Sequence, residues 1–538
     1  MSKVRFKDFG QVDFWSEQVF SQMPPDLFLE AVAEYIDFSF ADSICEPFYS
    51  HLGQHAYAPS LMLRIRFLHT YFTLSDRQLE YGLRYNLAYK KFAGIPANYY
   101  SFDHSSREDF DSRIPVEVHK AIFFHILAQI IDLGLHDPKE QWIIDATHSL
   151  SRATHHTTPS LIRQGITQLL YALERAAKNW TIVVDRELEL TDMISERLHY
   201  KAAEENKLQY FSRLVVTAFG LLARVDNLLS KGTLTPKYTA LVEEKAVILR
   251  RILEENIEPK DKDPLSDEVT YQQKPKEEKP KNRLASAVDP DARHSAKSDK
   301  KHYMGHKTQN LITAKSQFIV NVEGISATEN DGEALLAVVD EARGNTDLSP
   351  QKVLTDGQYT TTANFQGVQK RDLELVGNIK EPANPKGGYP LSSFHYDQEQ
   401  KTLTCPAGVV TEDTYRSETA HTTIYRFPEE KCNCCILKNK CTNRQKGRTV
   451  SISDNYHLIL KAKEYLSTDE GKAELKLRPS VERVNGVLKN RFGLGVTKSW
   501  GANKYKMQGY WSAIAYNVSR AVKLLHQREQ QALAALSQ

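Results

Sequence analysis

The sequence predicts an α/β protein in which a mixed β-sheet is interrupted by a long helical insertion and preceded by a helical domain. Three features predict this fold. Helical periodicity fills residues 1–135, short apolar runs with strand character begin at 141–147, and long amphipathic helical patterns fill 159–256. At 538 residues the chain exceeds one ordinary domain, and its 41% hydrophobic residues suffice for a sizeable core.

The remaining strands come after the insertion. Residues 308–328 predict two strands with a hairpin turn at Ser316-Gln317. The segments that follow predict a helix at 332–343, a strand at 352–356, a helix at 361–370 and a strand at 373–379. Without the insertion, this order of strands and helices predicts a mixed sheet of the RNase H type.

Composition and charge restrict the class of protein. The formal net charge is only +2, so total charge does not itself indicate a nucleic-acid binder. No apolar run reaches the roughly 18 residues that span a bilayer, and the first ten residues lack an apolar signal region. We therefore expect a cytoplasmic protein without a membrane segment. Five of the six cysteines fall between 405 and 441, a cluster that favours metal binding in a reducing compartment.

Three acidic residues are the main candidates for chemistry. Asp145 and Asp356 each end an apolar run, and such strand ends lie at the edge of a sheet where ligands bind. Glu482 lies within 478–489, a segment with a helical pattern. Taken singly, an Asp at a strand end is more often a turn residue. Together, the three carboxylates suit a pair of Mg²⁺ ions for phosphodiester chemistry.

The helix around Glu482 carries two cations at regular spacing. Arg478 precedes Glu482 by four residues and Lys489 follows it by seven, so all three share one helix face. Such a face, with a carboxylate between two cations, suits phosphate groups. An exposed helix with ordinary ion pairs between residues four apart fits the spacing equally well.

These residues resemble a DDE transposase of bacterial insertion sequences. Arg478, Glu482 and Lys489 match the signature Tyr-x2-Arg-x3-Glu-x6-Lys of one branch of that family, although Leu475 stands where the signature has Tyr. The block Asp356-Gly-Gln-Tyr359 resembles the segment around the second family Asp, and residues 59–110 resemble the N-terminal helical module.

The resemblance implies a definite activity. Asp145, Asp356 and Glu482 would bind Mg²⁺ or Mn²⁺, while Arg478 and Lys489 would contact phosphates near the cut. Water would cleave DNA at the element ends, and the freed 3′-OH would attack target DNA. The partners would be the terminal inverted repeats, target DNA, and a homodimer or higher synaptic oligomer acting at the bacterial nucleoid. Two alternatives stay open: an RNase H-like nuclease without strand transfer, and a domesticated, non-catalytic DNA-binding regulator.

The cysteines form a second candidate site. A lone Cys405 is followed by Cys432, Cys435 and Cys441, and four thiolates in two groups suit tetrahedral structural Zn²⁺. Cys434 is a spare thiol that would serve in place of either neighbour. A similar arrangement occurs in the transposase branch.

We expect seven segments. They are a helical N-terminal DNA-binding domain (1–135), a first part of the catalytic core (136–158), the helical insertion (159–256), a charged linker (257–301), a second part of the core (302–380), a Cys-rich zinc-binding insertion (381–452) and C-terminal helices with the catalytic Glu (453–538).

Overall fold

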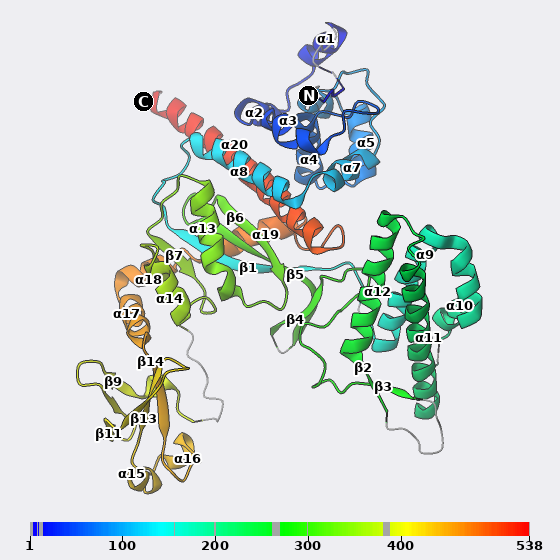
Figure 1. Ribbon diagram of the computed structural model, residues 1–538. Helices are drawn as coiled ribbons and strands as arrows, with labels where there is room; N and C mark the ends of the chain where they lie inside the picture. The colour runs from blue at the N-terminus through cyan, green and yellow to red at the C-terminus, as the bar shows by residue number, and fades with distance from the viewer. Residues whose placement is uncertain are drawn as a thin grey trace.

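The protein is an α/β molecule built around one mixed sheet (Figure 1). The computed structural model describes residues 4–7, 9, 14–154, 156–197, 199, 201–260, 269–298, 300–379 and 388–536. Positions 261–268 of the expected linker and 381–387 of the expected Cys-rich insertion lie outside the described residues.

The central sheet has the strand order β4-β5-β1-β7-β8, with β6 also paired to β5. Strand β1 pairs antiparallel with β5 and parallel with β7, which pairs parallel with β8. Trp142, Ile143 and Ile144 of β1 are fully buried, as a central strand covered on both faces requires. The strands are β1 (Trp142–Leu150), β4 (Arg293–Ser298), β5 (Lys301–Thr313), β6 (Ile319–Ser326), β7 (Lys352–Thr355) and β8 (Glu374–Gly377).

The elements expected after the insertion are present. Strands β5 and β6 form the predicted hairpin, and Gln317 in its turn has a positive φ of 60°. The short helix η2 (Asp331–Ala334) leads into α13 (Leu335–Asn345), and α14 (Thr362–Gln369) joins β7 to β8. The expected mixed sheet is therefore confirmed, since it contains both parallel and antiparallel pairs.

A helical region precedes the sheet and shares its core. The apolar core is continuous from the N-terminal helices through the sheet to α20. Ser75 accepts from the backbone N–H of Gln78, whose side chain accepts from the Ser75 N–H, and these two bonds cap the start of α5. The helices are α1 (Phe14–Gln22), α2 (Leu27–Tyr35), α3 (Phe40–Cys45), η1 (Glu46–Phe48), α4 (Pro59–Tyr71), α5 (Asp76–Tyr85), α6 (Leu87–Ala93), α7 (Ser105–Arg113) and α8 (Val116–Asp132).

The helical insertion has a core of its own. Leu169, Leu214 and Leu249, from three different helices, are fully buried in a cluster separate from the main core. Figure 1 shows these helices beside the sheet, joined to it through β4 and the end of β1. The helices are α9 (Thr158–Leu188), α10 (Leu190–Ser195), α11 (Glu204–Ser230) and α12 (Pro236–Asn256).

The expectation that 257–301 is an exposed linker is wrong for 284–292, whereas most residues of 274–283 are exposed. Strands β2 (Ile257–Pro259) and β3 (Tyr271–Gln273) pair, and Leu284 joins the core of the insertion. Asp289 is fully buried, where it accepts from the Ser151 hydroxyl (2.6 Å) and the Gly501 N–H (3.1 Å). The segment is poor in large aliphatic residues, but small side chains and satisfied polar groups allow it to pack.

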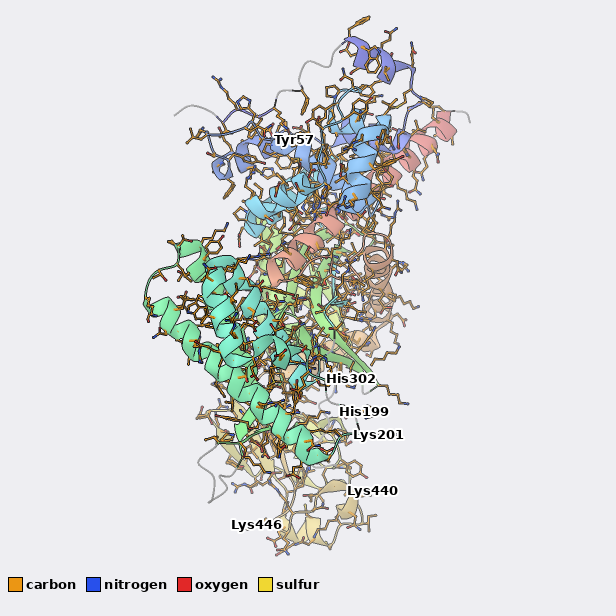
Figure 2. All side chains as sticks on the ribbon, turned by 90° about the vertical axis from the view of Figure 1, so that its right-hand side faces the viewer. Tyr57, His199, Lys201, His302, Lys440 and Lys446 are labelled. Carbon is orange, nitrogen blue, oxygen red and sulfur yellow. The ribbon has the colours of Figure 1, made fainter. Side chains whose placement is uncertain are left out.

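The Cys-rich segment forms a small separate unit with two three-stranded sheets. Figure 2 shows Lys440 and Lys446 at its outer end, away from the main sheet. Its elements are η3 (Leu391–Ser393), β9 (His395–Asp397), β10 (Thr402–Thr404), β11 (Val410–Thr411), β12 (Thr414–Ser417), β13 (Thr422–Arg426), α15 (Glu429–Asn433), α16 (Lys438–Cys441) and β14 (Thr449–Ser453).

Four helices complete the chain. They are α17 (Tyr456–Ser467), α18 (Asp469–Leu475), α19 (Pro479–Asn490) and α20 (Ala502–Leu536). Helix α19 packs on β1, and α20 packs on β6 and on α8 of the N-terminal region. Among the described residues, no single helix has the length and apolar character to cross a membrane; the bent pair α7–α8 meets that criterion only by combined length and composition.

The close pairing of β1 with β5 gives a first prediction. A Cβ added at Gly305 of β5 would lie 1.9 Å from the Ser149 carbonyl oxygen, so the strands would have to separate. We expect Gly305→Ala to lower the free energy of unfolding by more than about 2 kcal/mol. Urea denaturation measures the loss.

The same substitution at Gly344 of α13 is the matched control, because nothing lies within 4 Å of its added Cβ. Alanine also favours helix, so the Gly344→Ala variant should unfold at an equal or higher urea concentration than the parent. Equal stability of the two variants would contradict the tight β1–β5 contact.

Candidate active site

Two of the predicted acidic residues lie on neighbouring strands. Strands β1 and β7 pair with Ile143 opposite Leu354, and the same register two residues on places Asp145 beside Asp356. Adjacent strands lie about 4.8 Å apart, so the two carboxylates lie next to each other at the edge formed by the end of β7. The expectation that a strand also ends at Asp145 is wrong, because pairing with β5 continues β1 to Leu150. The Gln358 N–H donates to Asp356 Oδ1 at 2.8 Å, which fixes the turn after β7.

Glu482 reaches this edge from helix α19, and Arg478 connects it to the sheet. Arg478 Nη1 lies 3.1 Å from Glu482 Oε1, and Arg478 Nη2 lies 3.5 Å from Asp145 Oδ1. The Glu482 side chain is 60% exposed, whereas that of Asp145 is 15% exposed. Arg478 therefore bridges the largely buried carboxylate of Asp145 and the exposed carboxylate of Glu482.

Asn485 is a site residue that the sequence analysis missed. Its Nδ2 donates to Asp145 Oδ2 at 3.1 Å, and its Oδ1 accepts from Asn310 of β5 at 2.7 Å. Asn485 stands three residues after Glu482, on the same helix face, and this spacing is the signal that would have revealed it. The contact holds the Asp145 carboxylate in one orientation.

Asp331 is a fourth carboxylate near the site and was also missed. It lies in η2 and accepts from Lys307 Nζ at 2.8 Å. Its negative charge is one of those that raise the pKa of Asp145. No pattern around Asp331 in the sequence distinguishes it from a helix-start residue.

The environment of Asp145 disfavours its ionised form. Burial is the main cause that raises the pKa of Asp145 to about 6, with smaller contributions from the charges of Asp356 and Glu482 and an opposing one from Arg478. Lys489 is near enough for its charge to favour ionised Asp145, and burial lowers the pKa of Lys489 itself. All five predicted residues of this site thus lie in one region.

Tyr359 lies near the carboxylates. It is fully buried, and its hydroxyl has no hydrogen-bond partner among the described residues. Burial, followed by the charges of Asp331 and Asp145, raises the pKa of the phenol well above its ordinary value. Leu475, at the position of the signature Tyr, instead packs against the main core.

The donor atoms of this site fit a hard divalent cation, which takes carboxylate oxygens. A cation beside Asp145 would also offset the repulsion that raises its pKa. Within the described residues, however, no group of three or more His, Cys, Asp or Glu side chains is already arranged to hold a metal ion. The positive charge between Asp145 and Glu482 is the guanidinium group of Arg478.

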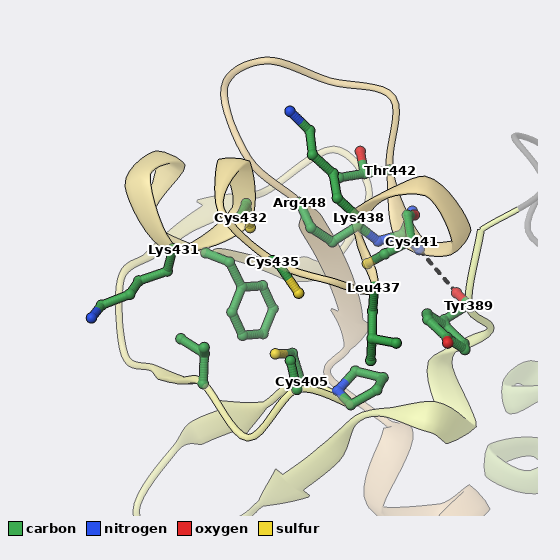
Figure 3. Close-up of a pocket in the computed structure, with 14 residues that line it drawn as sticks. Tyr389, Cys405, Lys431, Cys432, Cys435, Leu437, Lys438, Cys441, Thr442 and Arg448 are labelled. Carbon is green, nitrogen blue, oxygen red and sulfur yellow. Dashed lines mark hydrogen bonds between the residues drawn. The ribbon is translucent and has the colours of Figure 1, made fainter.

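The four predicted cysteines line a single cavity of the Cys-rich unit (Figure 3). Burial raises the pKa of Cys441, and the three other thiols, Cys405, Cys432 and Cys435, add to this shift. All six cysteines of the chain are described and are free thiols. Cys434 is exposed and donates through its Sγ to the Glu430 carbonyl, so it is not one of the four.

Two regions of the chain match known protein families. Residues 17–113 match a transposase domain (DUF772), and residues 404–522 match a transposase DDE domain. The second match includes Glu482 with its two cations, whereas Asp145 and Asp356 lie outside both matched ranges. No curated protein matches the chain.

These matches support a DDE transposase of the insertion-sequence type. Transposases act on DNA, and DDE transposase domains generally use divalent metal ions.

The raised pKa of Asp145 gives a second prediction. The folded protein holds the Asp145 proton up to about pH 6, whereas the unfolded chain releases it near its ordinary pKa of 3.8. Stability is therefore lost as the pH rises through this window, by about 1–3 kcal/mol. In metal-free buffer at pH 7, we expect Asp145→Asn to be more stable than the parent by that order.

Thermal unfolding at pH 4 and pH 7 measures the difference, which should shrink at pH 4 where the carboxyl is protonated. A variant less stable than the parent at pH 7 would show that Arg478 and Asn485 fully compensate the buried charge.

Proposed function

We propose that this protein is a transposase that binds the terminal inverted repeats of an insertion sequence, cleaves DNA at the element ends and joins the 3′-OH ends to target DNA. The observation that carries this proposal is the meeting of Asp145, Asp356 and Glu482 at one edge of the central sheet. The strand order, with β1 between antiparallel β5 and parallel β7, supports an RNase H-like core for these carboxylates.

Asp145, Asp356 and Glu482 would hold Mg²⁺ or Mn²⁺. When bound, the ions would activate the attacking oxygen and neutralise charge on the leaving oxygen. Asn485 keeps Asp145 oriented, so the carboxylate needs little rearrangement before reaction. Arg478 and Lys489 stand on the same helix face and would bind phosphates on either side of the cut.

The N-terminal helices would recognise the inverted repeats, and the basic outer end of the Cys-rich unit would contribute further DNA contact. Exposed Lys440 and Lys446 support the second assignment (Figure 2). Because transposition joins two element ends, we expect a dimer or larger assembly on DNA.

The third prediction concerns Glu482. Glu482→Gln keeps the size of the side chain but removes its charge, so cleavage and strand transfer should fall by at least about a hundredfold while end binding persists. The assay uses the inverted repeats that flank the gene, with gel analysis of both products in Mg²⁺. Glu464→Gln, an exposed residue of α17, is the matched control and should retain full activity.

The products also separate this proposal from its alternatives. Cleavage without joining by the parent protein would indicate an RNase H-like nuclease. Binding of the ends without either product would indicate a DNA-binding regulator. Full activity of Glu482→Gln would contradict the assignment of the active site.

We further propose that Cys405, Cys432, Cys435 and Cys441 hold a structural Zn²⁺. Their shared cavity and the outward position of Cys434 support this ligand set. Four thiolates leave no open position on the metal, so zinc would stabilise the unit rather than take part in the reaction.

The fourth prediction tests the ligand set. Purified parent and Cys434→Ser should each contain one zinc per chain, because Cys434 is not a ligand. Cys435→Ser should lose the metal and unfold at a lower temperature. Elemental analysis and thermal unfolding provide the two readouts. Zinc retained by Cys435→Ser but lost from Cys434→Ser would overturn the choice between these neighbours.

A further inference from the structure

A second cavity lies where the N-terminal helices meet the start of α20. Its volume is about 740 Å³, and it is lined by side chains from α4, α5, α7, α20, the segment that precedes α20 and the segment that follows β1. It is separate from the carboxylate site, since none of Asp145, Asp356 and Glu482 lines it. Five cations line its wall: Arg66, Arg107, Arg152, Lys498 and Lys504.

Three of these cations are neutralised within the cavity. Arg66 pairs with Asp111 at 3.2 Å, and Arg107 pairs with both Asp76 and Asp111. Lys504 pairs with Glu108. The three acidic residues of the wall are thus already engaged by cations.

Lys498 and Arg152 are different. In the described part of the chain, neither has a carboxylate within ion-pair distance. Burial, together with the charges of Arg66 and Arg107, lowers the pKa of Lys498 to about 8, although Asp76 opposes the shift. A largely buried ammonium group among other cations lacks a counter-ion, which is the condition that a bound anion would relieve.

The segment that carries Lys498 is held in place. The Lys498 N–H donates to Gln508 Oε1 at 2.9 Å, and Gln508 Nε2 donates to the Gly493 and Val496 carbonyls at 2.8 and 3.0 Å. The Thr497 N–H donates to the Leu150 carbonyl at 2.8 Å, so the segment is also attached to the end of β1. Lys498 is therefore presented on a fixed support.

The attachment to Leu150 also allows the distance between this segment and Asp145 to be estimated along β1. Leu150 lies five residues beyond Asp145 on β1, a distance of about 17 Å at 3.3 Å per residue. A DNA strand advances about 3.4 Å per nucleotide along the duplex axis, so 17 Å corresponds to about five nucleotides. Lys489 stands between, close enough to His148 to lower its pKa.

We propose that this cavity binds a backbone phosphate of DNA about five nucleotides from the cleavage position, with Lys498 and Arg152 as its counter-ions. The assignment to DNA rests on the proposed function. Trp500 at the rim, with its side chain 54% exposed, favours a nucleotide over a free phosphate, because it offers a flat surface to the adjoining sugar or base.

The test measures binding of the full-length protein to a duplex containing the element end, in metal-free buffer over a series of salt concentrations. Each phosphate contact contributes about one unit to the slope of log K against log salt. Lys498→Met and Arg152→Gln should each lower the slope by about one unit and weaken binding about tenfold at low salt. Lys461→Met, on exposed α17, removes an equal charge elsewhere and should leave the slope unchanged.

Two further readouts decide the outcome. Lys498→Met should be at least as heat-stable as the parent without DNA, because it removes a partly buried charge that lies among other cations; a marked loss of stability would assign Lys498 a structural role and overturn the proposal. An unchanged slope in Lys498→Met would also overturn it. If inorganic phosphate stabilises the parent but not this variant while the slopes agree, the site binds a free anion instead of DNA.

Failure of the two proposals can be distinguished. A parent protein that binds the ends without cutting them contradicts the transposase proposal but leaves the salt-slope comparison intact. A parent that cuts and joins normally, with equal slopes in all variants, contradicts only the phosphate site.

Discussion

The central position of β1 is the constraint on which the rest of the structure depends. Its first residues are buried among neighbours on both sides, so β5 and β7 must both align with it. This alignment places Asp145 beside Asp356, opposite Asn310, and under helix α19. A shift of one residue would turn every side chain of the strand to the other face. The register of one strand thus determines the geometry of the site.

Closely spaced carboxylates repel one another, and the structure limits that cost with Arg478. The guanidinium contacts Asp145 and Glu482 together, yet the pKa of Asp145 stays raised because burial outweighs this attraction. Arg478 thus reduces the repulsion among the carboxylates, but the site retains an excess of negative charge. That excess is what a divalent cation would neutralise, and Arg478 would then be available to a phosphate.

Several features could be predicted from sequence because they depend on local patterns. The apolar start of β1, the strand before Asp356, the cap at Ser75 and the helix carrying Glu482 all lie in short segments with distinct periodicity, whereas the continuation of β1 from Asp145 to Leu150 depends on its pairing with β5. Asp331 and the packing of Asp289 could not be predicted, since each depends on partners distant along the chain. Composition was misleading for 284–292, where small residues and satisfied polar groups replace large aliphatic ones.

The small net charge of the chain is compatible with binding a polyanion, because pairing rather than number decides which cations are available. Arg66, Arg107 and Lys504 count toward the total but are held by neighbouring acids. Lys498 and Arg152 have no carboxylate within ion-pair distance in the described residues, and both belong to segments that meet at the end of β1. Cations without a carboxylate partner are expected where a bound ligand supplies the missing negative charge. A net charge of +2 therefore conceals a local excess of unpaired cations along the path that leads away from Asp145.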